Sequence, residues 1–123
     1  MHSGDLVALV ENALDDLKAR ETRVLDVAPL TTITDYMVIS SGTSSRHVRA
    51  IADRLTEKAK EAGLIPLGVE GHEFGDWVLV DLDNVVVHIM QPNARDFYKL
   101  ENLWSVEEET GSTMGPTRAE PGR

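Results

Sequence analysis

The chain has 123 residues, of which 41% are hydrophobic and 27% charged, a composition typical of a globular protein with room for one domain. No apolar run approaches the roughly 18 residues that a membrane span requires, so we expect no membrane association. Twelve Lys and Arg against 21 Asp and Glu give a net charge of -9, which favours a basic partner and argues against extensive direct nucleic-acid binding. Cysteine is absent and the first residues show no targeting signal, so we expect a cytoplasmic protein without disulfides or thiolate metal sites.

The N-terminal part of the chain predicts one helix and two strands. The helix is amphipathic, takes Ser3 as its cap and ends near Arg20. Strands are expected at residues 23–27 and 36–40, and the second is expected to be central in the sheet because it is more continuously apolar. The helix is indicated by apolar residues at helical spacing, namely Leu6, Val10, Ala13, Leu14 and Leu17.

The rest of the chain predicts two further helices, three strands and a tail. A strongly periodic helix begins at Thr43 or Ser44 and stops at Gly63. Strands are expected at residues 65–70, 77–82 and 85–90, and the short link between the last two requires an antiparallel hairpin. The last helix is expected at residues 94–104. Residues 105–123 are acidic and nearly devoid of apolar side chains, so we predict a disordered tail after one domain at residues 1–104.

This order of elements predicts an α/β (α+β) fold, in which a mixed five-stranded sheet has helices packed mainly on one face. Alternation within the last two strands divides their side chains between two faces, one of them wholly aliphatic and therefore core. We expect the other face to point outward, because aromatic and Met side chains beside polar ones are typical of protein interfaces. Alternation alone leaves open a sheet that is covered on both faces. The expected outward residues are Trp77, Leu79, Asp81, His88 and Met90.

Two segments carry the residue types of a phosphate or metal site. Residues 39–45 leave a strand and enter a helix with several hydroxyls around Gly42, which could hold a phosphate, although a capped turn has the same pattern. Asp81 and Asp83 could hold magnesium for nucleotidyl transfer, which is the enzymatic alternative, yet a tight hairpin link also favours Asp for turn chemistry alone. No two histidines share metal-ligand spacing, so we predict no metal and no other cofactor.

Several motifs follow one another in order along residues 5–104. They are Leu25-Asp26-Val27, Thr34-Asp35-Tyr36-Met37-Val38-Ile39, Ser41-Gly42-Thr43-Ser44, Val48-Arg49-Ala50-Ile51-Ala52, Glu70-Gly71, Gly75-Asp76-Trp77-Val78-Leu79-Val80-Asp81, Val85-Val86-Val87-His88 and Arg95-Asp96-Phe97-Tyr98-Lys99-Leu100-Glu101-Asn102-Leu103-Trp104. Together these motifs resemble the ribosomal silencing factor family, also called RsfS or Iojap. The resemblance implies a nucleotidyltransferase-like fold that lacks the catalytic residues, and therefore no enzymatic activity.

The resemblance also implies a partner and a mechanism. Family members bind the large ribosomal subunit through ribosomal protein L-fourteen (L14), block its association with the small subunit and slow translation under nutrient limitation. A homodimer would hide an exposed sheet face in the free protein, and the sequence leaves that state open. The predicted partner-binding residues are Glu70, Trp77, Leu79, Asp81, His88, Met90 and Tyr98.

Overall fold

The structure is a computed structural model, and it describes residues 2–98. The predicted tail at residues 105–123, the domain boundary at residue 104 and the second half of the last helix lie outside the described residues. Every helix and strand predicted within residues 2–98 is present, several with shifted ends. In chain order they are α1 (Ser3–Asp16), β1 (Arg20–Asp26), β2 (Tyr36–Ser41), α2 (Ser45–Glu61), β3 (Gly68–Glu70), β4 (Trp77–Asp81), β5 (Val85–Met90) and α3 (Pro92–Tyr98).

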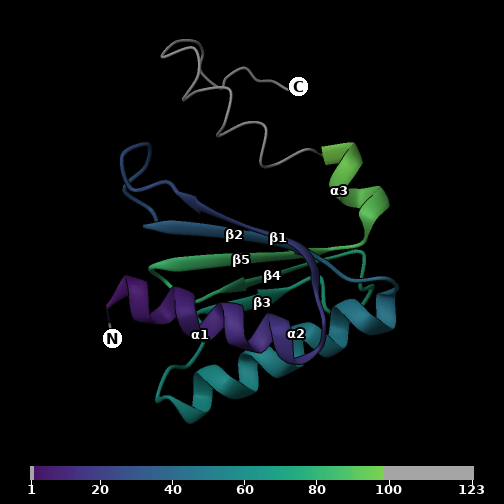
Figure 1. The fold of residues 1–123 in the computed structure, drawn as a ribbon, viewed down its shortest axis with the longest axis horizontal. Coiled ribbons are helices and arrows are strands. Elements are labelled where there is room, and N and C mark those ends of the chain that lie inside the picture. Colours follow the sequence, from purple (N-terminus) through teal and green to yellow (C-terminus); the bar gives the residue numbers. More distant parts are fainter. Residues whose placement is uncertain (1, 99–123) are drawn as a thin grey trace.

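The strands form one mixed sheet in the order β1-β2-β5-β4-β3 (Figure 1). β2 and β5 run parallel, whereas all other neighbouring pairs are antiparallel, including the predicted hairpin of β4 and β5. The parallel pair is possible because α2, β3 and β4 separate β2 from β5 along the chain. The mixed five-stranded sheet is therefore confirmed, and β2 is an interior strand between β1 and β5, as predicted.

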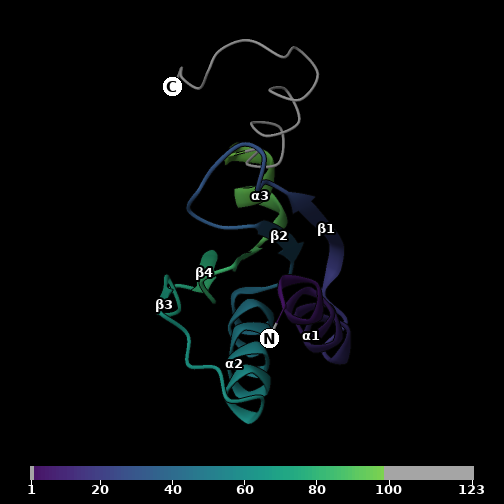
Figure 2. The same cartoon turned by 90° about the vertical axis from the view of Figure 1, so that its left-hand side faces the viewer.

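The helices lie on both sides of the sheet, with α1 and α2 together on one face and the short α3 on the other side, at the end of β5 (Figures 1 and 2). We call the face under α1 and α2 the helix face, and the opposite one the second face. The main core lies at the helix face, where each fully buried aliphatic side chain contributes roughly 1.5–3 kcal/mol of transfer free energy. Its buried residues include Leu6, Val10, Leu14, Val38, Val48, Ile51, Leu55, Val78, Val80, Val85, Val87 and Ile89.

The first helix differs from its prediction at both ends. His2 occupies the N-cap position without a side-chain cap bond, and Ser3 Oγ instead donates to Asp35 Oδ2 at 2.6 Å, so the prediction of Ser3 as the cap is wrong. The helix ends at Asp16 and not near Arg20, because Lys18 adopts a left-handed backbone conformation with φ of 58°. The chain can therefore enter β1 already at Arg20.

The second helix follows its prediction closely. Ser44 is its N-cap, with Oγ accepting from the His47 backbone N–H at 3.1 Å, and Gly63 follows its last turn with φ of 85°. A left-handed glycine at this position is the common way to end a helix, because it lets the next N–H groups bond back to the last carbonyls. Across residues 2–98, no helix has the length and apolar character needed to cross a bilayer.

Candidate partner-binding face

Strand register brings the predicted binding residues together on the second face. β4 pairs with β5 so that Trp77 lies opposite Met90, and Leu79 lies opposite His88. β3 adds Glu70 opposite Leu79. Because paired residues of neighbouring strands project from the same face of a sheet, these five side chains form one patch. Asp81 of β4 shares it, opposite Val86.

Exposure divides this patch into an accessible and a buried part. Glu70 is exposed, and the side chains of Trp77 and Leu79 are half-buried. His88 is only 7% exposed and Met90 is 0% exposed, so the prediction that both point into solvent is wrong. Alternation determines which face a side chain points to, but not how deeply it is buried. β5 has a neighbouring strand on each side, and α3 packs near its end.

Asp81 and Tyr98 complete the predicted set. Asp81 is half-buried at the end of β4, where its Oδ1 accepts from the Asp83 backbone N–H at 2.9 Å. Tyr98 ends α3, but its side chain lies outside the described residues, so its contact role stays a prediction.

Trp77 and His88 form a polar aromatic pair in the middle of the face. The indole Nε1–H of Trp77 donates to His88 Nδ1 at 2.9 Å, and the ring centroids are 5.8 Å apart at 44°. Burial lowers the pKa of His88 from 6.5 to about 4, because a charged imidazole loses its hydration there. A neutral imidazole that accepts at Nδ1 carries its proton on Nε2. His88 therefore fixes the orientation of the Trp77 ring near neutral pH.

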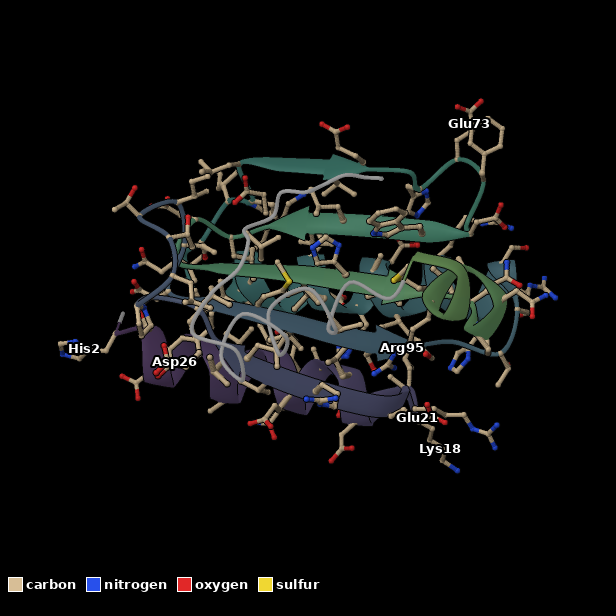
Figure 3. The ribbon with its side chains drawn as sticks, turned by 90° about the horizontal axis from the view of Figure 1, so that it is seen from above. His2, Lys18, Glu21, Asp26, Glu73 and Arg95 are labelled. Atoms are coloured by element: carbon tan, nitrogen blue, oxygen red, sulfur yellow. The ribbon has the colours of Figure 1, made fainter. Side chains whose placement is uncertain are left out.

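Arg95 is a residue of this face whose position the sequence did not predict. Its side chain is 7% exposed, and its Nη1 donates to Ser41 Oγ at 2.9 Å, which links α3 to the end of β2. Figure 3 looks onto the second face and shows Arg95 between α3 and the strands β1 and β2. A buried guanidinium of this kind is held by hydrogen bonds, because it keeps its charge. In the sequence, Arg95 was indicated only as the first residue of one of the motifs that carry the family resemblance.

The hydroxyl-rich segment at residues 39–45 serves the fold. Ser44 caps α2, and the N–H of Thr43 donates to His47 Nδ1 at 2.8 Å. The other ring nitrogen of His47 lies 2.7 Å from the carbonyl oxygen of Leu17, next to the end of α1. These contacts use the donors that a bound phosphate would need, and they support the alternative of a capped turn.

The acidic pair Asp81 and Asp83 belongs to the β4-β5 turn. Asp83 has a φ of 76°, a left-handed conformation that Asp tolerates better than most residues. The bond from its N–H to Asp81 Oδ1 is a local turn contact that occupies one oxygen of the carboxylate. Within residues 2–98, no cluster of three or more His, Asp or Glu side chains is arranged to hold a metal ion.

Sequence comparisons show the family of the chain, and a solved structure shares its fold. The chain matches the family described as "Ribosomal silencing factor during starvation" (RsfS) over residues 1–121. A ribosomal silencing factor RsfS from Haemophilus influenzae is 46% identical over 100 residues, which cover 81% of this chain and 98% of the relative. A mouse protein named "Mitochondrial assembly of ribosomal large subunit protein 1" is 35% identical over 103 residues, 81% of this chain and 45% of that protein. A Chromobacterium violaceum crystal structure has a TM-score of 0.84 and 37% identity, and the match covers 100% of this chain and 98% of that chain.

The chain therefore belongs to the ribosomal silencing factor (RsfS/Iojap) family, which acts on ribosomes and is not enzymatic. The metal-dependent nucleotidyltransferase that the sequence left as an alternative is wrong, in agreement with the turn role of Asp81. The likeness of the fold to nucleotidyltransferases stays a prediction.

Proposed function

We propose that the chain is a cytoplasmic translational repressor that binds the large ribosomal subunit through L14 and sterically blocks association with the small subunit under nutrient limitation. The family description supports silencing during starvation, and the name of the mouse relative connects that protein with the large subunit. The mechanism needs no chemistry. A domain that occupies a surface needed for subunit joining acts through its affinity and its residence time.

The observation that carries this proposal is the accessible part of the second face on β3 and β4. Trp77 and Leu79 offer apolar area that is only half-buried, and the carboxylates of Glu70 and Asp81 lie beside them. An aromatic anchor next to an acidic rim suits a basic ribosomal protein, because the charges steer the encounter while apolar contacts hold the complex. We assign contact with L14 to these four residues.

The two buried residues of the patch have a supporting role in this proposal. His88 accepts the hydrogen bond from the Trp77 indole, and Met90 lies directly opposite Trp77 in the next strand. A side chain that is already oriented loses less conformational entropy when the partner binds. His88 and Met90 therefore support the contact residues from the neighbouring strand β5. A free homodimer through the same face would compete with L14.

Binding of isolated L14 to two matched variants tests the location of the contact. Leu79→Ser removes apolar area from the second face, whereas Ile65→Ser removes it from a side chain that is 78% exposed and precedes β3. We expect Leu79→Ser to weaken binding about tenfold, as loss of a central apolar contact does, and Ile65→Ser to leave it nearly unchanged. Equal affinities of the two folded variants would contradict the assignment.

A further inference from the structure

Strand β1 contains a bulge that places two arginines on the same face of the sheet. Arg20 lies opposite Ser41 and Arg23 lies opposite Ile39, with a register shift between the two arginines. Residues three apart in a regular strand point to opposite faces, but one extra residue restores them to the same face. Glu21 within the bulge has a φ of 51°, a left-handed conformation that is costly for a residue with a side chain.

A buried serine on the helix face holds this bulge in place. Ser40 is 0% exposed, and its Oγ donates to the carbonyl oxygen of Arg20 at 3.1 Å. Since that bond uses its only proton, the hydroxyl of Thr22 is the donor in the 2.7 Å contact between Thr22 and Ser40. The bulge that orients Arg20 and Arg23 is therefore held by a buried hydroxyl and includes a strained backbone conformation.

These arginines give the two sides of the second face opposite charges. Its β3 and β4 side carries the carboxylates of Glu70 and Asp81, whereas its β1 side carries Arg20 and Arg23, with Arg95 bound to Ser41 between them and α3. Glu21, within the bulge, and Lys18, which precedes β1, have opposite charges and lie together at the end where β1 begins (Figure 3). A local excess of arginine on this face is unexpected in a chain with a net charge of -9.

We propose that Arg20 and Arg23 contact phosphates of ribosomal RNA next to the protein partner. The inference rests on the proposed binding to the large subunit and names a second class of contact there. An exposed guanidinium pairs well with phosphate oxygens, because its planar fork can donate two parallel hydrogen bonds. An acidic domain that docks on a ribosomal protein is repelled by the surrounding RNA, and two arginines at that edge remove the repulsion locally.

The salt dependence of binding tests this contact. The variant Arg20→Gln with Arg23→Gln is compared with Arg46→Gln with Lys60→Gln, which makes the same change in net charge on exposed positions of α2. Dissociation constants are measured for purified large subunits and for isolated L14. Two phosphate contacts account for a salt slope of about 1.4–1.8, so raising the salt from about 50 to about 200 mM should weaken wild-type binding about tenfold more than binding of the β1 variant.

Five outcomes of these measurements decide the inference. It is supported if the β1 variant loses that salt dependence on subunits and binds isolated L14 as wild type does, while the variant Arg20→Lys with Arg23→Lys keeps the wild-type slope. Wild-type salt dependence in the β1 variant overturns it, and so does equal weakening toward isolated L14, which would assign the arginines to carboxylates of the protein partner. If wild type binds L14 but the β1 and α2 variants behave alike on subunits, only this inference fails. If wild type binds neither, the proposed function fails with it.

Discussion

Acidification should destabilise the fold through His88. Its pKa is lowered to about 4 by burial, whereas the unfolded chain titrates this group near its ordinary value of 6.5. Between these values the unfolded state binds a proton that the folded state excludes, so the contribution of His88 to stability is complete above pH 6.5 and falls as the pH drops toward 4. From about pH 7.5 to about pH 5, this linkage lowers the free energy of unfolding by about 2 kcal/mol.

Urea denaturation of wild type and His88→Gln across this pH range measures the effect. Glutamine keeps an acceptor for the Trp77 indole but does not titrate, so the stability difference between the two proteins should shift by about 2 kcal/mol in favour of the variant on acidification. His2→Gln, at the exposed N-terminus, is the control for a histidine outside the sheet. A difference between wild type and His88→Gln that does not change with pH would refute the buried, neutral state of His88.

Three further substitutions test other contacts. Trp77→Ala should cost at least roughly 2 kcal/mol of binding to L14 by titration calorimetry, because the indole is the proposed anchor. Phe74→Ala, which removes a 72% exposed ring from the segment between β3 and β4, should cost little. Gly71→Ala should lower the free energy of unfolding by more than about 1 kcal/mol, because φ is 84° and an added Cβ would overlap the Trp77 carbonyl oxygen. Gly68→Ala is the control, because no atom lies within 4 Å of a Cβ added there. Equal stabilities of the two variants would refute the argument. Ser44→Ala should cost about 1 kcal/mol in the same denaturation assay and Ser44→Asp much less, and no loss in the alanine variant would contradict the cap.

The sequence predicted the elements whose signals are local. Ser44 and Gly63 bound α2 with ordinary capping chemistry, and the short β4-β5 link requires a hairpin, so both features are confirmed. The predicted end of α1 lies too far along the chain, because Lys18 adopts a left-handed conformation that lysine does not favour. Ser3 has the right type for a cap, but tertiary contact with Asp35 takes its hydroxyl.

The sequence predicted which residues share the binding face, but not how deeply each of them is buried. Period-two alternation placed Trp77, Leu79, His88 and Met90 on one face, and the strand register confirms it. The burial of His88 and Met90 depends on the position of β5 in the middle of the sheet and on α3, both of which are set by long-range topology. The bulge that orients Arg20 was equally invisible, because it arises from pairing with a strand elsewhere in the chain.

The central claim is tested most directly by a subunit-joining assay with purified subunits. The account predicts that the chain co-sediments with isolated large subunits, inhibits their reassociation with small subunits at about equal stoichiometry, and loses both effects together in the folded Trp77→Ala variant. Full reassociation in the presence of bound wild-type protein would contradict steric exclusion. Failure of the wild type to bind large subunits at low and moderate salt would contradict the proposed function as a whole.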